Sequence, residues 1–168
     1  MPKPGFWALA LLFALATTSI PVRSAAFDAG EPLPHLSGKT LDGDQFDLAS
    51  LKGKPVLLKV GTTWCGTCQQ QSKAIHQIAG FLKSNDVHYV EVFIQESETK
   101  VRKYLKRDGM SMPDTVILDE GDISRQLNIY LIPRVILIDR EQKVFRDGDS
   151  LPSKNLKKQL QTLLDSSQ

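Results

Sequence analysis

Trp64-Cys65-Gly66-Thr67-Cys68 contains both cysteines of the chain, with two residues between them. A short apolar run at 56–60 precedes this stretch, and apolar residues at helical spacing follow it to about residue 83. The change of period predicts that a strand buried on both faces ends just before the stretch and that a helix begins there. We expect one helix over 65–83, with both cysteines in its first turn and Asn85-Asp86 at its end.

Strands and helices alternate along the rest of the chain. Asp42-Gly43 separates extended pieces at 35–40 and 45–48, which predicts an N-terminal β-hairpin. The elements expected after the cysteine helix are a strand at 87–95, a helix at 98–107 capped by Ser97, a strand at 115–118, a short helix at 123–127, strands at 134–138 and 144–145, and a helix at 156–164 after Ser153. This order predicts an α/β domain with a central mixed β-sheet flanked by helices. The sheet should be parallel at the cysteine strand and its neighbour, and antiparallel at the last hairpin.

The composition is that of one ordinary globular domain. The 168 residues, 41% of them apolar, are enough for one buried core and too few for two. The formal charge is +2, and it falls close to zero without the first 24 residues, which hold two of the basic side chains. Such a balance gives no reason to expect binding to nucleic acid or to an anionic membrane.

The first 24 residues have the pattern of an export signal. Lys3 supplies a positive charge, 6–16 is an uninterrupted apolar run, and Ser24-Ala25-Ala26 offers small residues for cleavage. The run is shorter than the roughly 20 residues that span a bilayer. We predict a signal peptide at 1–24 and one folded domain at 25–168; an uncleaved membrane anchor and a soluble extension are the alternatives.

Export would place the two cysteines in a periplasmic or other extracytoplasmic compartment, where disulfides persist. A bridge that closes a two-residue loop removes little chain entropy, so reactivity explains the pair better than stabilisation does. A Cys-x-x-Cys pair at a strand-to-helix junction inside a β/α pattern therefore indicates thiol-disulfide exchange.

Several short motifs, in this order, resemble the exported TlpA, ResA and CcmG-type branch of the thioredoxin-fold thiol-disulfide oxidoreductases. They are Gly30-Glu31-Pro32-Leu33-Pro34, Leu41-Asp42-Gly43, Leu51-Lys52-Gly53-Lys54-Pro55-Val56, the cysteine stretch, an inserted strand and helix at 87–109 with Gln95-Glu96-Ser97 at their turn, Ile132-Pro133, and Ile136-Leu137-Ile138-Asp139-Arg140. The resemblance implies a thioredoxin-like fold with an N-terminal hairpin and a β-α insertion. It also implies a redox-active Cys65–Cys68 disulfide, with no metal and no other cofactor.

The two cysteines are expected to have different roles. Cys65 lies at the helix N-terminus, where free backbone N–H groups and the helix dipole favour the thiolate that exchange requires. We therefore expect Cys65 to be the nucleophile. Cys68, one turn further into the helix, is expected to resolve the mixed disulfide, and Gly66 and Thr67 to tune the stability of the thiolate.

The substrate is expected to lie beside Trp64, Ile132 and Pro133. Pro133 resembles the cis-proline of the family, and a cis bond would expose the backbone of Ile132 to an extended substrate segment. A trans proline at the start of an edge strand is the alternative. Trp64, next to an exposed cysteine, is expected to be a partly exposed lid rather than a core aromatic.

The chain departs from the family pattern beneath the cysteines. Lys59 stands six residues before Cys65, where thioredoxins have a buried acid. It could favour the thiolate, carry a proton, reach solvent at an edge, or pair with a carboxylate such as Glu96. Gln71 replaces a glutamate three residues after the second cysteine, and Arg134 adds a positive charge near the expected substrate groove. These changes leave the substrate and the redox direction open.

The resemblance favours a monomeric reductant of disulfides in exported proteins, such as those of cytochrome c maturation or copper-site assembly, supplied by a membrane thiol donor. A disulfide oxidase or isomerase is the alternative within the same chemistry. A non-catalytic thioredoxin-like binding module or a metal carrier is the alternative of another class. A metal site would need two ligands besides Cys65 and Cys68, and His76 lies roughly 12 Å along the same helix.

Overall fold

The computed structural model describes residues 26–107, 109–110 and 112–166. The signal peptide predicted at 1–24 lies outside them. Among the described residues, no helix combines the length and the apolar character needed to cross a membrane.

The strands of the described part of the chain form one mixed sheet in the order β2-β1-β5-β4-β3-β6-β7. Their bounds are β1 (Ser37–Thr40), β2 (Gln45–Asp47), β3 (Val56–Gly61), β4 (His88–Ile94), β5 (Thr115–Asp119), β6 (Arg134–Ile138) and β7 (Val144–Gly148). The three strands β3, β4 and β5 are parallel, and the other pairings are antiparallel. The predicted hairpin and the mixed sheet are both confirmed.

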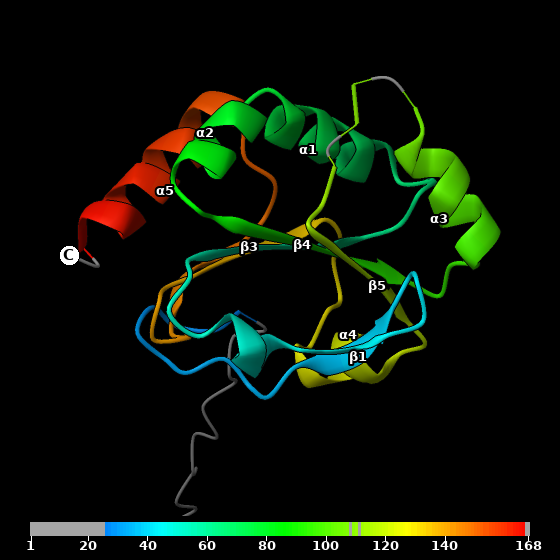
Figure 1. Ribbon diagram of the computed structural model, residues 1–168, viewed down its shortest axis with the longest axis horizontal. Coiled ribbons are helices and arrows are strands. Elements are labelled where there is room, and N and C mark those ends of the chain that lie inside the picture. The colour runs from blue at the N-terminus through cyan, green and yellow to red at the C-terminus, as the bar shows by residue number, and fades with distance from the viewer. Residues whose placement is uncertain (1–25, 108, 111, 167–168) are drawn as a thin grey trace, which may run out of the picture.

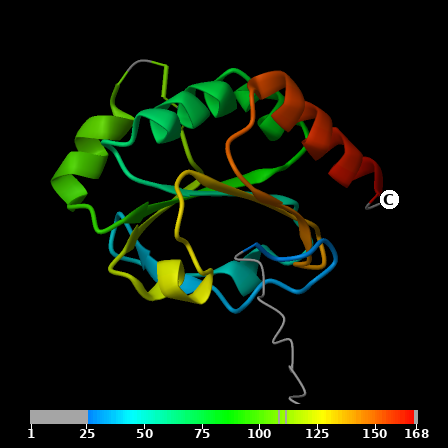
Figure 2. The same cartoon turned by 180° about the vertical axis from the view of Figure 1, so that it is seen from behind.

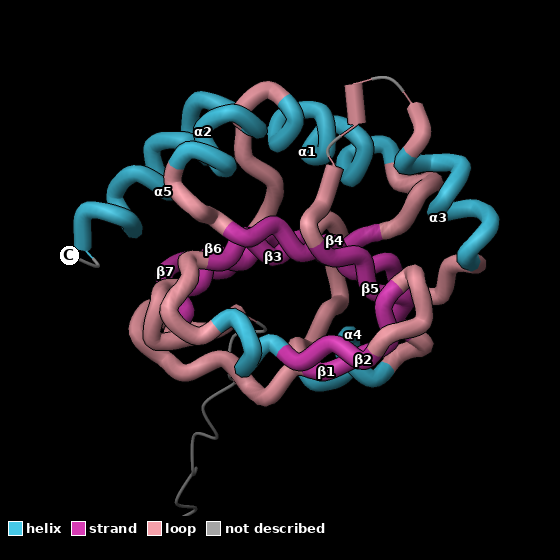
Figure 3. The backbone as a smooth tube through the Cα atoms, viewed as in Figure 1, coloured by secondary structure: helices cyan, strands magenta, loops and turns pink. Residues whose placement is uncertain are grey.

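Helices cover both faces of the sheet (Figure 1). One face carries α1 (Gly66–His76), α2 (Ala79–Ser84), α3 (Glu98–Leu105) and α5 (Ser153–Ser166). The other face carries α4 (Asp122–Gln126) and the short 3-10 helix η1 (Leu48–Leu51), as the reverse view also shows (Figure 2). The tube drawing shows the sheet as a layer between these helices (Figure 3).

Strand β3 lies inside the sheet, between β4 and β6, and is buried along its whole length. Its side chains alternate between the two faces. Leu58 and Val60 belong to the core on the α4 side, whereas Leu57 belongs to the core under α1, α2 and α5. Lys59 therefore points to the same face as Leu57, which is the face that α1 covers.

The single helix predicted over 65–83 is instead two helices. Ile78 leaves the helical conformation, with φ −112° and ψ 14°, and separates α1 from α2. Its side chain is 7% exposed and joins Leu82 in the core. The apolar spacing is the same on both sides of the break, so the periodicity of the sequence does not reveal it.

Candidate functional site

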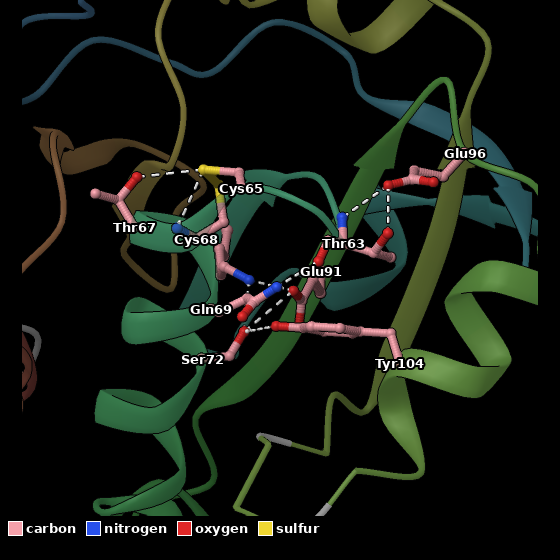
Figure 4. Close-up of a disulfide and its surroundings, with 10 residues drawn as sticks. Thr63, Cys65, Thr67, Cys68, Gln69, Ser72, Glu91, Glu96 and Tyr104 are labelled. Atoms are coloured by element: carbon pink, nitrogen blue, oxygen red, sulfur yellow. Dashed lines mark hydrogen bonds and ion pairs between the residues drawn. A yellow bond between two sulfur atoms is a disulfide. The ribbon is translucent and has the colours of Figure 1, made fainter.

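The cysteines lie at the junction of β3 and α1, as predicted, and form a disulfide (Figure 4). Cys65 is the N-cap residue of α1, and its Sγ accepts a hydrogen bond from the backbone N–H of Cys68 at 3.2 Å. The same sulfur lies 3.2 Å from Thr67 Oγ1. Cys65 is partly exposed whereas Cys68 is completely buried, so solvent reaches the first residue and not the second.

Gly61, the last residue of β3, makes room for the buried sulfur. A Cβ at this position would lie 3.0 Å from Cys68 Sγ and 3.3 Å from Cys68 Cβ. Few Cβ atoms have neighbours that close, so the helix can approach the strand this closely only because residue 61 has no side chain.

Lys59 is completely buried beneath α1. Its Nζ donates to Ser72 Oγ at 2.6 Å and forms an ion pair with Glu91 Oε1. Ser72 comes from the turn of α1 that follows Cys68, and Glu91 is the residue opposite Lys59 in the neighbouring strand β4. The pairing expected for Lys59 is therefore present, but its partner is Glu91 and not Glu96.

Two tyrosines extend this buried hydrogen-bond network. Tyr89 donates its hydroxyl to Glu91 Oε2 at 2.5 Å. Tyr104, on α3, donates its hydroxyl to Ser72 Oγ at 2.9 Å (Figure 4). Burial raises the pKa of Tyr104 above its ordinary value. The inserted strand β4 and helix α3 thus contribute polar groups to the space below the cysteines.

Glu96 holds the loop that enters the cysteine stretch. Its Oε1 accepts from the backbone N–H of Thr63 at 2.7 Å and from the Thr63 hydroxyl at 2.6 Å. Gln69 Nε2 donates to the Thr63 carbonyl at 2.8 Å. Glu96 was one candidate partner of Lys59, and it instead fixes the backbone just before Trp64 from the end of β4.

Gln71 is buried and connects α1 to the segment before α5. Its Oε1 accepts from the backbone N–H of Leu151 at 2.6 Å. Its Nε2 is buried without a hydrogen-bond partner in the described part of the chain. Gln71 therefore anchors a distant loop through its oxygen.

The bond between Ile132 and Pro133 is cis, as predicted. Antiparallel pairing of β3 with β6 places Val60 opposite Arg134, so this loop lies beside the end of β3 from which the cysteines follow. Trp64 is 73% exposed, so it is not a core aromatic, and its role as a lid stays a prediction. Leu131, directly before Ile132, is also exposed.

Arg134 was expected to add a positive charge near the substrate groove, and this prediction is wrong. Its side chain is almost completely buried and forms a two-pronged ion pair with Asp147 of β7, with Nη2 2.5 Å from Oδ2. Asp147 also accepts from the backbone N–H of Phe27 at 2.8 Å. The pair neutralises the charge of Arg134 and ties the N-terminal segment to β6 and β7.

A sequence model of the Redoxin family matches residues 28–160. The chain belongs to the Redoxin family. The thiol-disulfide oxidoreductase ResA of Bacillus thuringiensis subsp. konkukian is 25% identical over 138 residues, which cover 82% of this chain and 77% of that protein. The thioredoxin-like protein YneN of Bacillus subtilis is 28% identical over 129 residues, covering 74% and 73% respectively.

Solved structures agree with this assignment. A thiol:disulfide interchange protein of the thioredoxin family from Chlorobium tepidum has a TM-score of 0.70 and 26% identity, over 83% of this chain and 99% of that one. The thioredoxin-like fold is confirmed, and this Redoxin is a thiol-disulfide oxidoreductase with its cysteine pair at 65 and 68.

Glu91, Ser72 and Tyr104 were not predicted from the sequence as residues of the site in this Redoxin. Glu91 was one of several alternating residues in a strand expected to be interior. A charged residue in the middle of such a strand requires a partner, and the strand before it contains Lys59. That combination was the available signal, although strand order was needed to place the two side chains opposite each other.

Proposed function

We propose that this Redoxin reduces disulfides in exported proteins, with Cys65 as the nucleophile and Cys68 as the resolving thiol. The observation that carries the proposal is the contrast between the two sulfurs. Cys65 is partly exposed and its Sγ accepts a backbone N–H at the start of α1, whereas Cys68 is fully buried. A helix N-terminus favours the thiolate, so the accessible sulfur is also the one that the fold activates.

The exchange has two steps. The Cys65 thiolate attacks the substrate disulfide, forms a mixed disulfide and releases the first substrate sulfur as a thiolate. Cys68 then gives up its proton and attacks Cys65, which expels the second substrate sulfur. One protein thiolate, one protein thiol and one substrate disulfide become a Cys65–Cys68 disulfide, one substrate thiolate and one substrate thiol.

The substrate would bind beside the accessible sulfur, against Trp64, Ile132 and Pro133. The large exposure of Trp64 supports this position, since an exposed aromatic can pack on a partner. The backbone of Ile132 would pair with an extended substrate segment. Gly66 and Thr67 lie between the cysteines, and the contact of Thr67 Oγ1 with Cys65 Sγ supports a role in tuning the thiolate.

The location and partners belong to the same proposal. The pattern of residues 1–24 supports export, by a cleaved signal or an uncleaved anchor. In an oxidising compartment a reductant needs a supply of electrons, and a membrane thiol donor would provide it. Exported proteins of cytochrome c maturation or copper-site assembly are the proposed substrates, and the redox disulfide is the proposed cofactor of a monomeric enzyme.

Trapping experiments test the assigned roles. A Cys68→Ala variant should accumulate mixed disulfides with its substrates on Cys65, whereas Cys65→Ala should form none and should not reduce a peptide disulfide. Mass spectrometry of the trapped adducts would name the substrates. Exchange that persists in Cys65→Ala would reject the roles proposed for the two sulfurs.

A measured reduction potential decides the direction. A reductant of stable protein disulfides requires a potential well below that of dedicated disulfide-forming enzymes, which lie near about −120 mV. Equilibration with glutathione or a dithiol buffer gives this value directly. A potential near the oxidising limit would favour the alternative of a disulfide oxidase or isomerase.

A further inference from the structure

The buried ammonium of Lys59 has one more hydrogen-bond donor than the structure uses. A lysine ammonium has three N–H groups. Two of them serve Ser72 Oγ and Glu91 Oε1, and within the described residues the third has no acceptor. The ring of Phe93 flanks Nζ at 5.9 Å from its centroid. Because Lys59 is completely buried, bulk water does not reach this third N–H group.

The sulfur of Cys68 and the last carbon of the Lys59 side chain both border the space beside Gly61. The point at which a Cβ of Gly61 would stand is 3.0 Å from Cys68 Sγ and 4.0 Å from Lys59 Cε. Lys59 and Gly61 also face the same side of β3, two residues apart, so both lie beneath the first turns of α1. In the disulfide, Cys68 is a weak acceptor. Reduction would turn it into a thiol or thiolate that can accept a hydrogen bond.

The other polar groups around Lys59 are already engaged. On β4, Glu91 has Lys59 at one carboxylate oxygen and Tyr89 at the other. On α3, Tyr104 donates to Ser72. Burial raises the pKa of Tyr104, so its hydroxyl is neutral at neutral pH. On β6, the residue opposite Lys59 is Val135, which has no charge. Lys59 is thus the one cation among these described residues beneath α1.

We propose that Lys59 stabilises the thiolate of reduced Cys68 by donating its third N–H to that sulfur, which makes Cys68 a fast resolving nucleophile. This inference rests on the proposed function, because it concerns the second step of that exchange. The proton that Cys68 loses goes to the departing substrate sulfur. Lys59 is a positioning residue that acts on the thiolate without reacting.

The consequence is a short-lived mixed disulfide. Burial in apolar surroundings raises the pKa of a cysteine, so an unassisted Cys68 would be almost entirely thiol at neutral pH. When the pKa of a thiol falls by one unit, the fraction of thiolate rises up to about tenfold, whereas the nucleophilicity of the thiolate falls only about threefold. The gain in thiolate therefore dominates until the pKa of Cys68 approaches the working pH.

Titration of Cys68 alone tests the inference without any substrate. In a Cys65→Ser background, the ultraviolet absorbance of the thiolate should report a Cys68 pKa at least about one unit below the ordinary 8.5. Lys59→Met combined with Glu91→Gln removes both charges together and avoids a buried unpaired carboxylate. This double variant should raise the pKa by one unit or more and slow resolution of a preformed mixed disulfide about threefold for each unit, because the lost thiolate is partly offset by its higher nucleophilicity.

Glu91→Gln alone is the matched control. It keeps the ammonium and removes the competing negative charge, so the Cys68 pKa should stay low or fall further. A purely structural role of the ion pair would move both variants in the same direction. The assignment is wrong if Cys68 titrates at or above the ordinary cysteine value, or if the double variant leaves its pKa unchanged. Neither result would affect the trapping test of the proposed function.

Discussion

Gly61 stands where the buried sulfur of Cys68 meets the central strand. Gly61→Ala would introduce a methyl group 3.0 Å from Cys68 Sγ, and overpacking of this kind typically costs about 1–3 kcal/mol. We expect the free energy of unfolding in urea to fall by that amount. Gly80→Ala is the control, since a Cβ there has no neighbour within 4 Å and a helical alanine gains up to about 1 kcal/mol over glycine. Equal effects in both variants would contradict the steric explanation.

Gln71 is a second residue whose contribution depends on one contact. Gln71→Leu removes the oxygen that accepts the Leu151 N–H, and a buried donor without a partner costs about 1–3 kcal/mol. Thermal unfolding should show a corresponding fall in stability. Gln70→Leu, on the exposed side of the same helix, should change stability by less than about 0.5 kcal/mol. An unchanged midpoint in Gln71→Leu would mean that the loop finds another acceptor.

The positions of the two cysteines in the fold could be predicted from the sequence. Cys65 as helix N-cap and Cys68 inside the helix follow from local patterns, because a helix start is a short-range feature. The cis bond at Pro133 was implied by the resemblance to the family. Glu96 was named as a candidate partner of Lys59, and Arg134 was expected to add a positive charge near the groove; the structure instead pairs Lys59 with Glu91 and Arg134 with Asp147. Both side chains reach residues on other strands, and local patterns do not define which strands are neighbours.

Helix α3 connects the inserted element to the space beneath the cysteines through Tyr104. Burial raises the pKa of Tyr104, so the folded state favours the neutral phenol. Its stabilising contribution is complete below the unfolded pKa of about 10 and is lost as the pH rises above that value. Tyr104→Phe should cost about 1 kcal/mol at neutral pH, because it loses the hydrogen bond to Ser72.

The pH profile distinguishes Tyr104 from an ordinary tyrosine. Unfolding free energies measured across about pH 8 to 11 should fall more steeply in the parent protein than in Tyr104→Phe. Tyr130→Phe, at a side chain that is 78% exposed, should follow the parent profile. Parallel profiles for the parent and Tyr104→Phe would show that burial of the phenol does not couple to stability.

At the level of elements, the sequence predicted the order and type of the strands and of most helices. The exceptions have local causes. The break at Ile78 leaves the apolar period unchanged, and η1 is a single turn capped by the Asp47 carboxylate, which accepts from the Ala49 N–H. Helix α3 ends at Leu105, two residues earlier than expected. Helix ends fray, and their bounds vary by one or two residues.

At the scale of the whole molecule, the buried ion pair of Arg134 and Asp147 connects segments from the two ends of the chain. This pair links β6 to β7, and Asp147 also holds the N-terminal segment at Phe27. Asp147→Asn would leave the Arg134 charge buried without a carboxylate, which costs about 3–5 kcal/mol. We expect a large fall in the thermal midpoint. Asp149→Asn, at an exposed side chain, should leave it nearly unchanged; comparable losses in both variants would argue against a special role for the pair.

The sequence by itself determined the alternation of strands and helices, the cysteine pair at a strand-to-helix junction and the cis-proline motif. Each of these depends on residues that are close together along the chain. Tertiary structure decided that Lys59 pairs with Glu91, that Glu96 holds Thr63, and that Arg134 is neutralised. These contacts depend on the order and register of strands separated by tens of residues, and a buried charge accepts whichever partner that register brings within hydrogen-bond distance.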